Sequence, residues 1–223
     1  MNGIYRSHVK FLRKCGVRGS GDGEFAWPQS LVIDGAGNVY VSDQGNDRIQ
    51  VFDAYGRFLR KWGEDGIGDE EFSWVQGLGI DQKDNIYVSD RGNHRIQVFD
   101  SHGNFLRKWG MRGSGDGELS QPQGLAIDFY SNVYVSEYGN NRIQVFDSKG
   151  RFLRKWGRRG IGDGEFSRPQ GLAIDYDGNV YVSDHWNDRI QVFDAQGRFL
   201  RKWGARGRGD GHFSGPQCLA IDF

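Results

Sequence analysis

The sequence predicts an all-β protein assembled from four-stranded antiparallel units, and three observations lead to this prediction. A block of 47 residues recurs without insertions, because the string Arg-Ile-Gln-Val-Phe-Asp begins at Arg48, Arg95, Arg142 and Arg189. Within each block the apolar residues alternate with a period of two, which favours strands over helices. Glycine is abundant, at 35 of 223 residues, which suits many short strands joined by tight turns.

Each block is expected to hold four strands, and the last complete block illustrates them. The predicted strands cover residues 172–175, 179–184, 189–194 and 199–203. Turn residues separate them: Asp177-Gly178, then His185-Trp186-Asn187, then Ala195-Gln196-Gly197. A glycine at the position of Gly197 suits the left-handed position of a short hairpin. Four antiparallel strands repeated every forty-odd residues are the pattern of β-propeller blades.

Three strings in each block resemble the NHL repeat. In the last block they begin at Pro169 (Pro-Gln-Gly-Leu-Ala-Ile-Asp), Asn179 (Asn-Val-Tyr-Val-Ser-Asp) and Asn187 (Asn-Asp-Arg-Ile-Gln-Val-Phe-Asp). The string that gives the family its name is matched best at residues 93–96, Asn-His-Arg-Ile. The resemblance covers nearly the whole chain. It implies a propeller, commonly of six blades, in which the first strand of each blade is innermost.

The whole chain, residues 1–223, is therefore expected to form a single propeller domain. Complete blades are predicted at about 24–63, 71–110, 118–157 and 165–204, with parts of further blades at 1–16 and 212–223. The two ends together lack a second strand, so joining them would place two strands parallel in an otherwise antiparallel blade. We therefore expect an open arc that forms part of a six-bladed ring. Its free strand edges would favour self-association.

Two sets of recurring residues are interpreted as scaffold. An acid precedes each recurring arginine by five positions, and it is expected to pair with an arginine or to cap a turn. The acids are Asp43, Asp90, Glu137 and Asp184. A single active site needs no fourfold copy of its carboxylate. The tryptophans of the fourth strands are expected to pack between blades, and they are Trp62, Trp109, Trp156 and Trp203.

The sequence does not predict an enzyme. Neither a Gly-x-Ser-x-Gly elbow nor a His-Glu-x-x-His motif occurs, and the five histidines do not share a repeat position. The recurring Gly-x-Gly-Asp-Gly loops, such as that around Asp163, are similar to calcium-binding repeats but supply too few acids, so turn stabilisation is expected instead. We expect no cofactor and no metal site. A metal-dependent lyase or lactonase on the propeller axis stays as the alternative enzyme hypothesis.

A binding function is predicted at one end of the propeller. Strand alternation places the turns between strands two and three, and the loops between blades, at the same end. Related NHL domains are known to bind partners there. Binding residues are expected where the blades differ, and tryptophan and arginine are typical of interface hot spots. The predicted partner-binding residues are Trp27, Trp74, Arg91, Tyr138, Arg158, Arg159, Arg168, His185, Trp186 and Arg206.

The charge pattern favours a protein as the partner. The chain carries 29 basic and 29 acidic residues, and the loop end is negative overall, whereas a phosphate-binding surface should be positive. An acidic sector around residues 64–71 lies about two blades from a basic sector around residues 158–168 and 206–208. Single-stranded RNA on the basic sector is the alternative. The family resemblance also implies the substrate-recognition module of a ubiquitin ligase, whose catalytic RING would lie outside this chain.

The cellular location is predicted only from the lack of targeting signals. The first sixteen residues contain no apolar run, and no stretch of about 18 apolar residues occurs. The two cysteines, Cys15 and Cys218, form neither a disulfide framework nor a metal-ligand spacing. We therefore expect a cytoplasmic protein that does not bind membranes.

Overall fold

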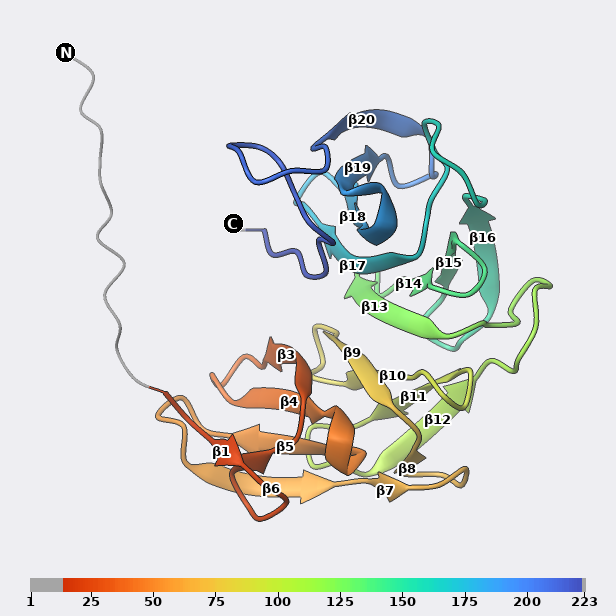
Figure 1. Cartoon of the computed structure of the whole chain (residues 1–223). Coiled ribbons are helices and arrows are strands. Elements are labelled where there is room, and N and C mark those ends of the chain that lie inside the picture. Colours follow the sequence, from red (N-terminus) through yellow and green to blue (C-terminus); the bar gives the residue numbers. More distant parts are fainter. Residues whose placement is uncertain (1–13, 222–223) are drawn as a thin grey trace.

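The computed structural model describes residues 14–221 and confirms the all-β propeller fold. Four four-stranded antiparallel sheets, the blades, are arranged in an arc with one strand of each toward the centre (Figure 1). Blade 1 holds β3 (Pro28–Ile33), β4 (Val39–Asp43), β5 (Arg48–Phe52) and β6 (Phe58–Trp62). Blade 2 holds β9 (Val75–Ile80), β10 (Ile86–Asp90), β11 (Arg95–Phe99) and β12 (Phe105–Trp109). Blade 3 holds β13 (Pro122–Ile127), β14 (Val133–Glu137), β15 (Arg142–Phe146) and β16 (Phe152–Trp156). Blade 4 holds β17 (Pro169–Ile174), β18 (Val180–Asp184), β19 (Arg189–Phe193) and β20 (Phe199–Trp203).

The loops between blades contain short pieces of regular structure. Two loops form parallel two-residue pairs: β1 (Val17–Arg18) with β2 (Glu24–Phe25), and β7 (Glu64–Asp65) with β8 (Glu71–Phe72). In the later loops the same two positions form a single parallel β-bridge instead of a two-residue pair, for example between Arg112 and Leu119. Two 3₁₀ turns, η1 (Gln44–Asn46) and η2 (His185–Asn187), join the second and third strands of blades 1 and 4.

The hydrophobic core lies between the blades. At the first interface Tyr40 and Ile49 of blade 1 pack with Phe72 and Ile86 of blade 2, and all four are fully buried. Two further clusters of the same kind fill the next two interfaces. Trp62 packs against Phe99 of the following blade, with ring centroids 5.7 Å apart. The predicted inter-blade packing of this tryptophan is therefore confirmed.

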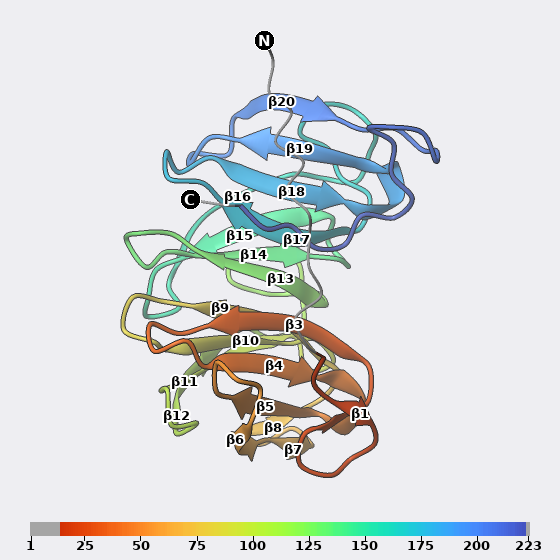
Figure 2. The ribbon, with the colours of Figure 1, turned by 90° about the vertical axis from the view of Figure 1, so that its left-hand side faces the viewer.

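The innermost strands of neighbouring blades lie side by side, and in Figure 2 they run through the middle of the molecule. Ser89 Oγ of blade 2 donates a hydrogen bond to the carbonyl oxygen of Gln123 of blade 3, at 2.5 Å. A Cβ atom on Gly77 would lie 2.1 Å from that same oxygen. Glycine at this position therefore allows the two inner strands to come together.

The arc is open where the described ends of the chain lie. Residues 1–13 of the first predicted partial blade fall outside the described residues. In the second, residues 212–221 contain no strand, although Ser183 Oγ donates to the carbonyl oxygen of Gln217 at 3.0 Å. This bond places the segment where an innermost strand would lie, but within residues 14–221 it has no second strand to pair with. On the other side of the opening Leu31 is 60% exposed, whereas the equivalent Leu78 is 3% exposed.

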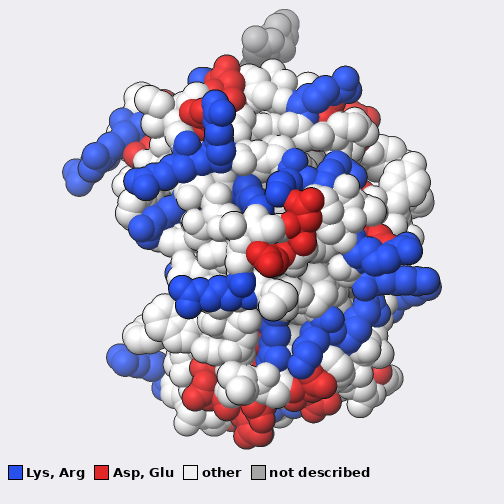
Figure 3. All heavy atoms as spheres, turned by 90° about the vertical axis from the view of Figure 1, so that its right-hand side faces the viewer, with Lys and Arg blue, Asp and Glu red and all other residues white. Residues whose placement is uncertain are grey.

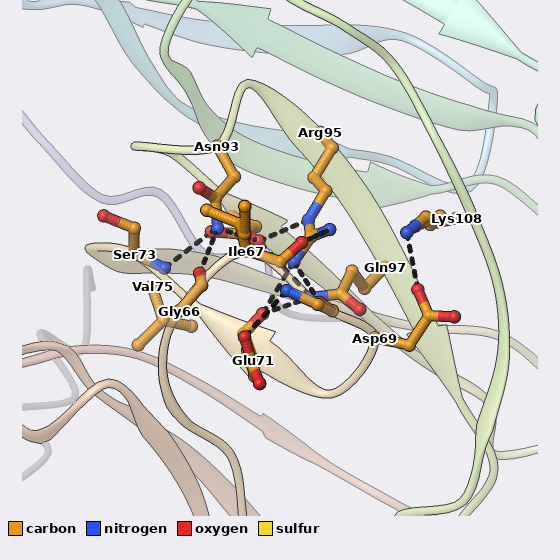
Figure 4. A network of polar contacts seen from close by, with 12 residues as sticks. Gly66, Ile67, Asp69, Glu71, Ser73, Val75, Asn93, Arg95, Gln97 and Lys108 are labelled. Atoms are coloured by element: carbon orange, nitrogen blue, oxygen red, sulfur yellow. Dashed lines mark hydrogen bonds and ion pairs between the residues drawn. The ribbon is translucent and has the colours of Figure 1, made fainter.

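One buried arginine in each blade joins several elements. Register pairs Asp90 with Arg95 across β10 and β11, and Arg95 Nε donates to Asp90 Oδ2 at 2.6 Å. Figure 4 shows Arg95 among the residues of the loop that enters the blade. The guanidinium also donates to the carbonyl oxygens of Ile67, Gly68 and Glu71, at 2.6 to 2.8 Å. All of these acceptors except Asp90 belong to the loop that enters the blade. The equivalent acid–arginine pairs are Asp43–Arg48, Glu137–Arg142 and Asp184–Arg189, which confirms the predicted scaffold role.

We predict that Arg95→Lys lowers the free energy of unfolding by about 3 kcal/mol, because an ammonium group cannot replace the planar donors and leaves buried acceptors unsatisfied. The matched control is Arg198→Lys. The Arg198 side chain pairs with Asp194 and is itself 78% exposed, so this change should alter stability by less than about 0.5 kcal/mol. Urea unfolding measures both. Equal losses in the two variants would contradict a special role for the buried site.

A second recurring network surrounds a buried tyrosine. The Tyr87 hydroxyl donates to Asp81 Oδ2 at 3.1 Å and accepts from Arg107. Burial raises the pKa of the tyrosine to about 12, with the nearby Asp81 charge acting in the same direction. Burial likewise raises the pKa values of Tyr40 and Tyr134 to about 12.

These pKa values predict a loss of stability in alkali. The folded state retains protons that the unfolded state releases above pH 10, so this contribution is complete below pH 10 and falls as the pH rises toward 12. The loss should be on the order of 1 kcal/mol per tyrosine near pH 11. The triple variant Tyr40→Phe, Tyr87→Phe, Tyr134→Phe should show a smaller drop between pH 9 and pH 11 in urea unfolding. An identical drop would contradict the assignment.

Candidate functional site

The predicted binding end of the propeller, here called the loop face, is formed by the inter-blade loops together with the turns between strands two and three. Backbone hydrogen bonds hold the two sets of segments together. Gly92 N donates to the Ser73 carbonyl at 2.7 Å, and Trp186 N donates to the Ser167 carbonyl at 3.0 Å. Each turn is therefore fixed beside the loop that enters its own blade, as strand alternation predicts.

Five residues on the loop face form an alternating stack of aromatic rings and guanidinium groups, here called the ladder. The ladder runs across blades 2, 3 and 4 in the order Trp74, Arg91, Tyr138, Arg168, Trp186. Arg91 Cζ lies 5.4 Å from the ring centroid of Trp74 and 5.2 Å from that of Tyr138. Arg168 Cζ lies 4.6 Å from the Tyr138 centroid and 3.7 Å from the Trp186 centroid. Arg168 Nη1 also donates a hydrogen bond to the Tyr138 hydroxyl.

The buried acids of the scaffold position the ladder. Asp90 directly precedes Arg91, and its Oδ1 accepts a hydrogen bond at 2.8 Å from Ser73 N, the residue before Trp74. In blade 4, Asp184 lies two residues before Trp186, and its Oδ1 accepts a bond at 2.6 Å from the backbone N of the residue before Arg168. In blades 2 and 4, one carboxylate thus fixes the backbone on both sides of a ladder contact.

Two ladder residues adopt a backbone conformation that side chains usually avoid. Trp74 and Arg168 have φ values of 55° and 56°, in the left-handed region. The same repeat position in the last loop is Gly215, with φ 61°. A residue other than glycine costs roughly 1 kcal/mol in this region. The fold itself therefore needs no large side chain here, although these two blades carry tryptophan and arginine.

The ladder is polar, exposed at both ends and positively charged. Trp74 is 59% exposed and Trp186 is 55% exposed, whereas Arg91, Tyr138 and Arg168 are half-buried. Burial lowers the pKa of Arg91, and the nearby Arg168 charge lowers it further while Tyr138 opposes the shift. Arginine still stays protonated at neutral pH. Two like charges are thus held in one stack.

The other five predicted binding residues lie outside the ladder. Trp27 is exposed and lines a hollow with Cys15, Val17 and Phe25 at the open side of the arc. Arg158 pairs with Glu165 at 2.9 Å, and Arg159 and Arg206 are exposed in their loops. His185 Nδ1 lies 3.3 Å from the carbonyl oxygen of Pro216. The structure therefore brings together half of the predicted set.

The propeller axis carries a different kind of surface. A channel of about 750 Å³ is lined by the inner strands, and its polar side chains are mainly the glutamines Gln29, Gln76, Gln123, Gln170 and Gln217. Within residues 14–221 no group of three or more His, Cys, Asp or Glu side chains is arranged to hold a metal ion. The loop aspartates form ion pairs with outer-strand lysines, for example Asp69 with Lys108 at 2.6 Å (Figure 4). The sequence predicts that these aspartates stabilise turns. In the structure their recurring interaction is instead the ion pair with a lysine of the outer strand.

One exposed aromatic group was not anticipated from the sequence. Phe129, Tyr130 and Tyr176 are 76%, 83% and 92% exposed, in the turns between strands one and two at the end opposite the loop face. The equivalent turn of blade 1 carries Gly35 and Ala36. Comparing the blades at this end as well as at the loop face would have revealed the difference.

A family model described as the NHL repeat matches residues 25–52, 72–99 and 166–193. Each match runs from the end of an inter-blade loop to the end of a third strand. The chain therefore contains NHL repeats. A human protein, NHL repeat-containing protein 3, is 53% identical over 38 residues, which cover 17% of this chain and 11% of the relative. The human E3 ubiquitin-protein ligase TRIM32 is 52% identical over 42 residues, covering 19% of this chain and 6% of the relative.

Solved structures share the fold of this NHL-repeat chain at low identity. A streptogramin B lyase structure has a TM-score of 0.62 at 14% identity, covering 79% of this chain and 54% of the lyase. Hydrazine synthase of Kuenenia stuttgartiensis has a TM-score of 0.62 at 16% identity, covering 90% of this chain and 52% of that chain. The NHL blades described here thus span about half the length of these structures. In the described residues, no helix is long and apolar enough to cross a membrane.

The left-handed positions predict that ladder residues can be removed without unfolding the NHL blades. Trp74→Gly and Arg168→Gly should change the free energy of unfolding by less than about 1 kcal/mol, because relief of backbone strain offsets the lost ring contacts. Trp62→Gly, which removes an inter-blade ring, should cost about 3 kcal/mol or more. Thermal unfolding followed by circular dichroism compares the three. A large loss from Arg168→Gly would show that the ladder is needed for folding.

Proposed function

We propose that this NHL propeller is a non-catalytic module that binds a protein partner on the loop face, with the ladder as the main contact. The observation that carries the proposal is the ladder itself. It is assembled from residues of three blades whose types differ from blade to blade, whereas the residues that hold the fold recur in every blade. Exposed tryptophans beside arginines are the side chains most often found at energetic centres of protein interfaces.

The carboxylates and the channel support a binding role rather than a catalytic one. The four recurring acids are bound to buried arginines and loop amides, so their charge is already used in holding the blades together. The channel along the axis, where a lyase or lactonase site would be expected, is lined by amide, apolar and small side chains. Its described lining holds no His, Asp, Glu, Lys or Tyr, and Cys218 is its one titratable side chain. A binding scaffold fits these surfaces best.

The similarity to a ubiquitin ligase suggests one setting for such a module. TRIM32 is named as an E3 ubiquitin-protein ligase, and the matched segment is a single stretch of 42 residues. In a ligase of that type, a propeller of this kind would select the substrate while another domain transfers ubiquitin. We propose this role for the loop face. RNA on the same face is the alternative to be distinguished by experiment.

Site-specific cross-linking tests the proposed face. A photoreactive phenylalanine analogue would replace Trp74 or Trp186 in the full chain, and Tyr176 at the opposite end would serve as the matched exposed aromatic control. After irradiation in a lysate of the source cells, positions 74 and 186 should give a shared cross-linked protein band that position 176 does not give. The band should survive ribonuclease treatment.

Two results would contradict the proposal. Cross-links at position 176 together with none at 74 and 186 would place the partner on the opposite end. Material captured at the ladder that disappears after ribonuclease treatment would favour the RNA alternative.

A further inference from the structure

The ladder contains positive charge that the described residues do not neutralise with an ion pair. The salt bridges of residues 14–221 include neither Arg91 nor Arg168, although both guanidiniums contact Tyr138. Arg91 Nε is buried and has no hydrogen-bond partner in the described structure. Holding two guanidiniums in one stack without a carboxylate is unfavourable. The arrangement is explained if an anionic group binds there.

The geometry restricts how an anion can approach. Each guanidinium lies close to two aromatic rings, so its planar faces are largely engaged by cation–π contacts. Among the edge N–H groups, Arg91 Nε is buried and Arg168 Nη1 donates to the Tyr138 hydroxyl, so an anion would meet the remaining N–H groups of each guanidinium. An edge-on approach is the one by which a carboxylate accepts two parallel hydrogen bonds from arginine. The exposed rings of Trp74 and Trp186 extend this anion site with apolar surface on both sides.

The neighbouring charges favour isolated carboxylates over a polyphosphate chain. The loop that carries Trp74 also carries Glu64, Asp65 and Glu70, all exposed. Figure 3 shows acidic side chains gathered toward the lower edge of the molecule, the height at which Figure 1 places β6 and β7. A nucleic-acid backbone crossing the ladder toward that loop would bring phosphates against these carboxylates. A peptide can instead place acidic residues at the arginines and a neutral or basic residue at the loop.

We propose that the ladder is a receptor for an acidic peptide segment, whose Asp or Glu carboxylates bind the edges of Arg91 and Arg168 while neighbouring apolar side chains contact Trp74 and Trp186. This inference rests on the proposed function of the loop face as a protein-binding surface. It adds the chemical class of the partner segment. Arg91 and Arg168 determine specificity, and the two tryptophans contribute contact area.

Binding of a defined peptide tests the inference. The probe is a fluorescein-labelled dodecapeptide that repeats Glu-Ser-Phe-Glu, compared with a twin in which every Glu is Gln and with a labelled oligouridine of the same length. Fluorescence anisotropy at low ionic strength should show binding of the glutamate peptide. The glutamine twin and the oligouridine should bind at least about tenfold more weakly.

Variants of the full chain separate a specific site from general charge. Arg91→Gln and Arg168→Gly should each weaken binding of the glutamate peptide by about tenfold or more. Arg198→Gln removes one positive charge from an exposed side chain in the turn between β19 and β20, outside the predicted binding residues, and it should change the affinity by less than about twofold. Melting temperatures of all three variants confirm that each remains folded.

Several outcomes would overturn the inference. They are no measurable binding of the glutamate peptide, equal binding of the glutamine twin, an equal effect of Arg198→Gln, or tighter binding of oligouridine that Arg91→Gln abolishes. The cross-linking experiment separates this failure from failure of the proposed function. If the glutamate peptide does not compete with the protein cross-linked at position 74, the acidic-peptide inference is wrong while the protein-binding face stands. If no protein is cross-linked at the ladder, the proposed function itself is wrong.

Discussion

A buried arginine in each blade holds the loop that enters that blade, and much of the remaining structure depends on this contact. In blade 2 the guanidinium of Arg95 satisfies Asp90 and three carbonyl oxygens of the loop at once. A buried guanidinium is stable only when its donors are satisfied, and the loop carbonyls have few other buried donors available. The buried guanidinium therefore depends on the loop carbonyl oxygens as acceptors, and these oxygens depend on the guanidinium as a donor. The inter-blade loop becomes part of the folded core rather than a loose connection.

The same carboxylate links the scaffold to the candidate site. Asp90 pairs with Arg95 on one side and accepts the backbone N–H of Ser73 on the other, between Trp74 and Arg91. Ring and guanidinium are thereby placed on the loop face before any partner arrives. Pre-positioned side chains lose less conformational entropy on binding, which is the usual advantage of a rigid scaffold that presents variable residues. The recurring residues build the platform, and the residues that differ between blades form the surface that contacts a partner.

The fold could be predicted from the sequence because every block repeats the same local signals. The period-two pattern and the turn residues place the strands to within a few residues, and the acid five positions before Arg95 predicts their pairing across β10 and β11. The site was predictable only in part. Variation between blades selected all five ladder residues, but it selected five others as well. Which of them meet depends on the spacing between blades, which is not visible within a single repeat. The left-handed backbone does not decide it, because Trp27 has the same conformation, with φ 54°, and lies outside the ladder.

Amide hydrogen exchange of the native protein tests most directly whether the buried arginines make the inter-blade loops part of the core. The amides of Gly66, Gly68 and Ser73 donate to Phe72 O, Glu71 Oε2 and Asp90 Oδ1. If the loop opens only with the blade, these amides should exchange as slowly as those of β11, with protection that reflects global unfolding. Rapid exchange of the three loop amides while β11 stays protected would show that the loop moves independently. The loop face would then not be a preformed binding surface.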